Sequence, residues 1–400
     1  MRVDLLTREY PPDVYGGAGV HLEYLARELA KLVDVHVHAW GADRDGARPP
    51  VHAYRPWDAL GGEAPELAAM RAMSIDLTMA AGTRGTDVVH SHTWYANLAG
   101  HLAKLVHDVP HVATVHSLEP LRPWKAEQLG GGYALSSFCE RVALEAADAV
   151  IAVSEGMRRD VLECYPKLDP GRVRVVYNGV DSEEYAPDPG TDVLERHGVD
   201  PARPSVVFVG RITRQKGVAH LLRAALQIDP EAQLVLAAGA PDTPEIAAEV
   251  TERMERVRAE RGNMIWLQEM LPKSDVIQLL SHATMFVCPS IYEPLGIVNL
   301  EAMACEASVV ASAVGGIVEV VEDGTTGLLV PFEPVDDGTQ EPADPEGFAA
   351  DFATAVNALL ADRARAAEMG RAGRRRAVER FSWPAIARET VAVYEGVAGG

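Results

Sequence analysis

Two carboxylates at fixed spacing are the clearest chemical signal in the sequence. They bound the segment EPLGIVNLE, residues 293–301. A proline suits the first turn of a helix, which predicts Glu293 in the preceding loop and Glu301 about two turns into the helix. The N–H groups of residues 295–298 would then be free at a positive helix end. Glu293 can accept hydrogen bonds from sugar hydroxyls, and Glu301 can bind a ribose diol.

Two cations follow an apolar run in GRITRQKG, residues 210–217. The planar guanidinium of Arg211 can donate two hydrogen bonds to phosphate oxygens, and the flexible Lys216 side chain adds a positive charge. Their position at a strand's end between glycines predicts a pyrophosphate clamp. A second glycine-rich turn, GGAGVH at residues 16–21, follows the first strand and can bring the N–H groups of Gly16 and Gly17 close to an anion. Its spacing is not G-x-G-x-x-G, so the dinucleotide fingerprint is absent.

Histidines also stand at predicted strand ends. His116 follows the strand 111–115 and is either structural or part of a site. His90 and His92 end the preceding strand and are followed by Trp94. A metal site there would need a third ligand that the spacing does not supply, so no metal site is predicted.

Composition bounds the protein class. The 400 residues carry a formal net charge of −21, with 48% hydrophobic and 24% charged residues. These values are typical of a folded enzyme of two or three domains and argue against a duplex nucleic-acid binder. The four cysteines have no zinc-ligand spacing, which favours free thiols in a cytoplasmic protein. We expect neither a signal peptide nor a membrane span, because Asp4 interrupts the first apolar run and no apolar run of about 18 residues occurs.

Short apolar runs alternate with helical patterns along the whole chain, which predicts an α/β protein with doubly wound parallel sheets. The pattern breaks at a Pro-rich stretch and then restarts. We therefore expect two Rossmann-like domains facing a central cleft, residues 1–183 and 205–383, joined by a linker at 184–204. A last helix, 384–400, would pack back on the first domain. We interpret the Arg-rich segment 363–380 as a solvated helix face. The expected strands are 3–6, 35–39, 88–90, 111–115, 149–153 and 173–176, then 206–209, 233–237, 264–267, 285–288, 309–311 and 327–330.

The GGAGVH turn, R-x-x-x-x-K and E-x7-E together resemble the retaining GT-B glycosyltransferases of family four, over nearly the whole chain. The stretch LTREYPPDVYGGAGVH, residues 6–21, is similar to the actinobacterial glycogen-synthase branch, whose members make α-maltose 1-phosphate. The resemblance implies transfer of glucose from ADP-glucose, with retention, to O4 of an α-glucosyl acceptor, most simply glucose 1-phosphate. It implies no cofactor and no bound metal. A homodimer is a reasonable expectation.

The resemblance also implies roles for residues. Arg211 and Lys216 hold the diphosphate and stabilise the leaving group, and Glu301 takes the ribose. His116 supports the donor sugar beside the anomeric centre. The donor sugar is oriented by Glu293 together with the backbone of Leu295, Gly296 and Ile297. Gly16 and Gly17 would approach the diphosphate or the acceptor from the other domain.

The acceptor is open at this stage. Glucose 1-phosphate would need a second anion site in the first domain, for which Lys125 and Arg141 are candidates. A glycogen-elongating synthase would instead need aromatic platforms, and Trp94, Trp124 and Tyr133 could serve. Asn178 is a weaker candidate, since Asn-Gly is typical of a turn.

Other functions compete with this one. A related transferase could use another nucleotide sugar with a phosphoinositol or lipid-linked acceptor, although residues 70–83 hold one cation and so make a poor membrane helix. An NAD-dependent oxidoreductase would need the missing fingerprint. A non-catalytic sugar-binding protein would not need Arg211, Lys216, Glu293 and Glu301 together. The nucleobase of the donor is not specified by the sequence.

Overall fold

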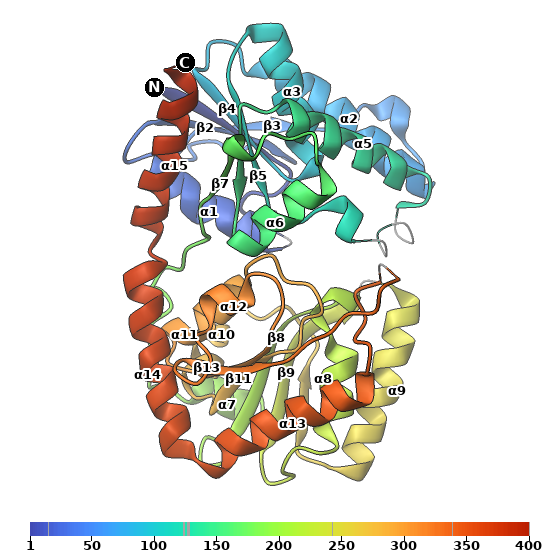
Figure 1. Cartoon of the computed structure of the whole chain (residues 1–400), viewed down its shortest axis with the longest axis vertical. Coiled ribbons are helices and arrows are strands. Elements are labelled where there is room, and N and C mark those ends of the chain that lie inside the picture. The colour runs from blue at the N-terminus through green and yellow to red at the C-terminus, as the bar shows by residue number, and fades with distance from the viewer. Residues whose placement is uncertain (15, 123–124, 126–128, 242, 338, 400) are drawn as a thin grey trace. The chain divides into compact units, whose positions relative to one another are not determined.

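A computed structural model of the chain describes residues 1–14, 16–122, 125, 129–241, 243–337 and 339–399. The chain forms two compact units (Figure 1). The first unit contains residues 1–179 and 383–400, and the second contains residues 180–382. Each unit has its own parallel sheet flanked by helices, which confirms the predicted Rossmann-like architecture.

The sheet of the first unit has the strand order β3-β2-β1-β4-β5-β6-β7. The sequence pattern missed one of these strands, β3, because it is a half-exposed edge strand without an apolar run. The strands are β1 (Arg2–Thr7), β2 (Asp34–Trp40), β3 (Val51–Tyr54), β4 (Val88–His92), β5 (His111–Val115), β6 (Ala149–Ala152) and β7 (Val173–Val175). The helices are α1 (Gly17–Leu29), α2 (Pro65–Gly82), α3 (Trp94–His107), α5 (Gly132–Ala146), α6 (Glu155–Cys164) and α15 (Trp383–Ala398).

Alternation along the strands builds two apolar layers in this unit. Val3 and Leu5 of β1 join a core that includes Trp383 and Tyr394 of α15. Leu6, on the other face, packs with residues of α2 and α3. The last helix therefore completes the core of the first unit, where the sequence predicted that it would pack.

The sheet of the second unit has the strand order β10-β9-β8-β11-β12-β13. One apolar layer of its core lies under α8, α9 and α13, and further buried apolar residues come from α10, α11 and α12. The strands are β8 (Ser205–Ile212), β9 (Gln233–Pro241), β10 (Met264–Leu267), β11 (Met285–Cys288), β12 (Ser308–Ser312) and β13 (Gly327–Val330). The helices are α7 (Asp192–Arg196), α8 (Val218–Ala225), α9 (Pro244–Glu260), α10 (Lys273–Ser281), α11 (Ile297–Ala304), α12 (Ile317–Val320), α13 (Pro345–Ala361) and α14 (Arg363–Arg380).

The predicted linker is part of the second unit. It contains α7, whose Val193 is buried. The Val193 N–H donates to the Gln278 side chain at 2.7 Å, and Arg196 pairs with Asp275 of α10 at 2.9 Å. The Pro-rich stretch that was predicted to be a linker between the domains is therefore a segment of the second unit that packs on α10.

The prediction of a solvated Arg-rich helix is wrong for two side chains of α14. Arg374 donates to the backbone carbonyls of Ser182 and Ala304. Arg376 donates to the backbone carbonyl of Val320 at 2.9 Å. Both guanidinium groups therefore fasten α14 to its own unit. Among the described residues, no helix has the length and apolar character needed to cross a membrane.

Both sheets have one point where the order of connections reverses. In the first unit it lies between β1 and β4, and in the second between β8 and β11. Loops leaving two such strands diverge to opposite sides, so a crevice opens at their carboxyl ends. Ligand-binding side chains are expected at these two points.

Candidate active site

A buried ion pair occupies the reversal point of the second unit. Lys216 follows β8, Glu293 follows β11, and the Lys216 ammonium donates to the Glu293 carboxylate at 2.6 Å. The hydroxyl of Ser290 also donates to that carboxylate, at 3.1 Å. Burial would lower the pKa of the Lys216 ammonium, but Glu293 outweighs burial and raises it. The pair therefore holds a protonated lysine, with its charge balanced by Glu293, at the end of the central strands.

Close backbone approach shapes both loops around this pair. Gly217 has a φ of +62°, and a Cβ there would lie 1.9 Å from the carbonyl oxygen of Pro289. Gly315 has a φ of +49°, and a Cβ there would lie 2.1 Å from the carbonyl oxygen of Glu293. The Gly316 N–H donates to that same oxygen at 3.0 Å. Gly217 belongs to the predicted clamp segment, whereas Gly315 and Gly316 were not singled out in the sequence, because their contacts are made to a loop that follows a different strand.

The helix after Glu293 starts later than predicted. It begins at Ile297, because Gly296 has a φ of +90° and interrupts the helical backbone after Leu295. Glu301 is therefore the fifth residue of α11, about one turn from its start. The peptide groups of Leu295, Gly296 and Ile297 form the turn that leads into the helix.

Glu301 is 8% exposed and lies in the same region as the ion pair. Burial raises the pKa of its carboxyl to about 7, and Tyr185, Lys273 and Lys216 oppose this effect. Arg211, at the end of β8, lies near enough to Lys216 to influence its pKa. The structure thus gathers Arg211, Lys216, Glu293 and Glu301 in one place.

In the first unit, the glycine-rich turn already holds an anionic group. The Gly16 N–H donates to the Glu9 carboxylate at 2.8 Å. Gly17 opens α1 and is exposed. A carboxylate at a helix N-terminus fits the electrostatics predicted for this turn. Binding of a diphosphate to the Gly16 N–H remains a prediction, and it would require Glu9 to move.

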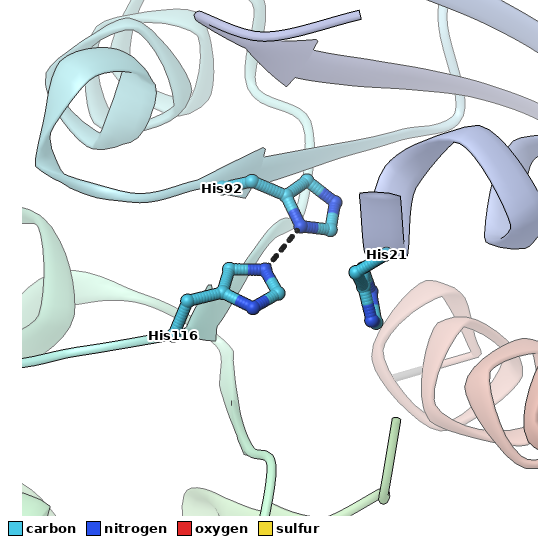
Figure 2. Close-up of side chains that lie close together, drawn as sticks. All are labelled: His21, His92 and His116. Carbon is cyan, nitrogen blue, oxygen red and sulfur yellow. Dashed lines mark hydrogen bonds between the residues drawn. The ribbon is translucent and has the colours of Figure 1, made fainter. Parts of the chain in front are cut away.

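Three histidines converge at the reversal point of the first unit: His21 of α1, His92 at the end of β4 and His116 directly after β5 (Figure 2). His92 Nδ1 lies 3.1 Å from His116 Nε2. Burial lowers the pKa of His21 to about 4 and takes the pKa values of His92 and His116 well below 6.5. All three rings are therefore neutral at pH 7. The sequence offered no third partner for His92, because His21 lies on a helix far away along the chain.

His90 has a different, structural role. Its Nδ1 lies 2.6 Å from the hydroxyl of Tyr394, and its Nε2 lies 2.6 Å from the hydroxyl of Thr114. Both nitrogens are thus satisfied inside the core. The centre of its ring lies 4.2 Å from that of His92, with the two rings tilted by 38°.

The residues predicted for the acceptor are scattered. Trp94 is 3% exposed and packs on Tyr95 at 4.0 Å, so it is not an open stacking platform. Arg141 is exposed on α5, and its neighbour Glu140 turns inward, so the Arg141 side chain points away from the loop after β5. Asn178 is buried after β7, near His21. Lys125 lies in a segment of which little is described, and Trp124 lies outside the described residues.

Two arginines that the sequence did not suggest stand at the strand ends of the first unit. Arg8 follows β1, and its guanidinium carbon is 4.2 Å from the centre of the Tyr95 ring. Arg122 donates to the hydroxyl of Ser117 at 3.0 Å, and its buried Nε has no partner among the described residues. Both guanidinium groups influence the pKa of Tyr95, so they lie in one region. Their positions depend on strand order, which gives no local sequence signal.

Comparison with known proteins agrees with this geometry. Residues 15–184 match Glycosyltransferase Family 4, and residues 192–376 match Glycosyl transferases group 1. Two parallel sheets carrying charged groups at their reversal points, together with these matches, define a glycosyltransferase of the GT-B fold. A sucrose-phosphate synthase from Thermosynechococcus elongatus shares the fold with a TM-score of 0.79, at 24% identity over 100% of this chain and 99% of that chain.

The relatives narrow the class. An alpha-maltose-1-phosphate synthase from Mycolicibacterium smegmatis is 57% identical over 401 residues, covering 100% of both chains. The one from Mycobacterium tuberculosis is 54% identical over 99% of this chain and 100% of its own length. The chain belongs to this alpha-maltose-1-phosphate synthase branch of the GT-B glycosyltransferases, which confirms the resemblance seen in its motifs.

Proposed function

We propose that the chain transfers glucose from ADP-glucose to O4 of glucose 1-phosphate, with retention of configuration, and releases ADP and α-maltose 1-phosphate. The observation that carries this proposal is the 57% identity with an alpha-maltose-1-phosphate synthase over the complete chain. We further propose that the reaction takes place in the cytoplasm, which the four free cysteines support.

The donor residues suit a leaving diphosphate. Charge develops on the phosphate oxygen as the glycosidic bond breaks, and Lys216 and Arg211 would stabilise it. Glu293 keeps Lys216 protonated and can accept a hydrogen bond from the donor sugar. The leaving phosphate would take the proton of the acceptor hydroxyl on the same face of the sugar. These two fixed cations supply the charge that the step needs, so we propose that no metal is required.

We propose that Arg8 and Arg122 bind the acceptor phosphate. The Arg8 guanidinium rests on an aromatic ring and makes no ion pair among the described residues, so it is available to an anion. Arg122 is held by Ser117, one residue after His116. Both arginines therefore present donors beside the strand end where the donor sugar is expected.

A glycogen-elongating synthase is the second candidate. It is less favoured, because Trp94 is buried and the hydroxyl of Tyr133 donates to the backbone carbonyl of Glu119 at 2.6 Å. Neither ring is arranged as an open platform for a glucan. A phosphoinositol acceptor would use the same arginines, and only its ring would distinguish it from glucose 1-phosphate.

Product analysis separates these candidates. ADP-glucose and, separately, UDP-glucose are offered with glucose 1-phosphate, inositol phosphate or glycogen in parallel, and products are identified by mass spectrometry and NMR. We expect a phosphorylated disaccharide with an α-1,4 linkage from glucose 1-phosphate. Transfer to glycogen alone would overturn the proposed acceptor, and transfer from UDP-glucose alone would overturn the proposed donor.

The acceptor phosphate site has its own test. Arg8→Ala and Arg122→Ala should each raise KM for glucose 1-phosphate by about 10-fold or more, the loss expected for a charge-assisted contact, and leave KM for the donor nearly unchanged. Arg141→Ala is the matched control, because this side chain is exposed and points elsewhere. A larger increase in KM for glucose 1-phosphate in Arg141→Ala than in Arg8→Ala and Arg122→Ala would contradict the proposed phosphate site.

A further inference from the structure

The three histidines of the first unit share one small space (Figure 2). Each ring has one nitrogen that could bind a metal ion, and these three nitrogens all lie within 4.8 Å of one another. His92 Nδ1 and His116 Nε2 are 3.1 Å apart and share a hydrogen bond (Figure 2), which a bound ion would replace. Nitrogens bound to one tetrahedral zinc ion are about 3.3 Å apart, since each Zn–N bond is about 2.05 Å.

The polar atoms of this cluster lack partners that their burial calls for. His21 is 3% exposed, and among the described residues its ring nitrogens make no hydrogen bond of normal geometry, although the Asn178 side chain lies near enough to raise the pKa of the ring. Unpaired buried nitrogens cost free energy unless a ligand satisfies them. Neutral imidazole nitrogens are preferred ligands of zinc-type ions.

The surroundings suit a bound cation. The buried Asn178 side chain already interacts with the His21 ring, and its carbonyl oxygen makes no hydrogen bond of normal geometry in the described part of the chain, so it can accept the remaining N–H of a metal-bound His21 ring. His116 is partly exposed at the end of β5, which leaves a route for entry and a coordination position open. Three imidazoles with one open position match zinc sites that exchange a ligand.

We propose that His21, His92 and His116 bind one zinc-type divalent ion, and that the bound ion inhibits glucosyl transfer. The inhibition rests on the proposed function, because His116 is expected to support the donor sugar. An ion on His116 would withdraw that side chain from the sugar. The binding itself does not depend on any assumed reaction.

Binding is measured first, on the intact chain without substrates. Calorimetry with Zn²⁺ and the visible absorption of Co²⁺ report the number of ions and a tetrahedral nitrogen site. His21→Gln should weaken binding by at least about 100-fold, more than the 10- to 100-fold loss caused by removing a hydrogen-bond partner of a ligand. His92→Gln provides a second, independent removal of a ligand, and thermal unfolding verifies that each variant is folded.

The matched control is the double variant His36→Gln, His52→Gln. These histidines form the other close pair, with nitrogens 3.0 Å apart near the surface. We expect the control to keep one ion per chain, and its turnover to fall with Zn²⁺ and return with a chelator. In His21→Gln, turnover should persist at Zn²⁺ concentrations that inhibit the control.

Three results would overturn the proposal. They are an absence of stoichiometric binding to the wild-type chain, binding that survives in folded His21→Gln, and binding lost in the control alone. Tight binding without inhibition would establish the site and remove the proposed inhibition. A chain that binds the ion but does not use ADP-glucose would leave the site intact and contradict the proposed function instead.

Discussion

At the scale of single residues, the donor site depends on charges that are buried together. Lys216 and Glu293 pair at 2.6 Å, and their side chains are only 19% and 8% exposed. Removing one partner of such a pair destabilises the folded protein by more than the intact pair stabilises it, because the other charge stays buried without a partner. Substitutions here therefore affect both chemistry and stability, and the two effects need separate measurements.

Lys216→Ala should lower kcat by at least about 100-fold, since it removes a cation from the leaving diphosphate. Steady-state kinetics with ADP-glucose measure this, and thermal unfolding establishes that the variant is folded. Lys31→Ala is the control, because Lys31 is an exposed lysine that also pairs with a glutamate. Near-normal turnover in folded Lys216→Ala would remove this residue from the proposed mechanism.

Glu301 predicts a pH-dependent stability. Burial raises the pKa of its carboxyl from 4.5 to about 7, so the folded state binds this proton more tightly than the unfolded chain. The resulting stability is complete below pH 4.5 and is lost as the pH rises through about 7. From pH 5.5 to 8.5 the loss is about 2 kcal/mol.

Glu301→Gln should abolish this loss, because the amide does not ionise. Chemical denaturation of both chains at several pH values gives the comparison, in which other titrating groups cancel. A constant difference in the free energy of unfolding between wild type and Glu301→Gln across this range would contradict the shifted pKa.

At the scale of elements, glycines let loops from different strands touch. The loop after β12 reaches the backbone of Glu293 only because Gly315 and Gly316 carry no side chain. The sequence pattern correctly predicts the strand before this loop and the helix after Glu293. It places the helix start too early, because the left-handed backbone of Gly296 cannot be seen from periodicity.

Gly315→Ala should destabilise the chain by about 2–4 kcal/mol and lower turnover, because its Cβ would displace the backbone of Glu293. Gly324→Ala is matched in backbone, with a φ of +74°, but a Cβ there meets nothing within 4 Å. Its cost should be about 1 kcal/mol, from the left-handed conformation alone. Thermal unfolding and turnover are measured for both, and equal losses would contradict the role given to close approach.

At the scale of the whole molecule, the end of the chain completes the first unit. The α15 helix buries Trp383 and Tyr394. The Trp383 ring stacks on the Tyr24 ring, and the Tyr394 hydroxyl is hydrogen-bonded to His90. Burying each such side chain is worth about 1.5–3 kcal/mol, so their combined loss is a large part of the 5–15 kcal/mol that holds a typical domain.

A chain ending at Ser382 should therefore lose the fold of its first unit while the second unit keeps its own. Limited proteolysis with mass spectrometry would show rapid cleavage within residues 1–179 and slow cleavage within 205–361. A chain ending at Ala398 keeps the helix and serves as control. Equal protection of both units in the shorter chain would contradict this dependence.

The sequence by itself determined the alternation of strands and helices, the parallel sheets and the motif residues at strand ends. These are local properties, since apolar runs, glycines and charges act within a few residues. Tertiary structure alone decided which strand ends are neighbours. It paired Lys216 with Glu293 across 77 positions, joined His21 to His92 and His116, and set Arg8 near Arg122. Strand order in a sheet is set by packing of the whole unit, so no local pattern of residues encodes these contacts.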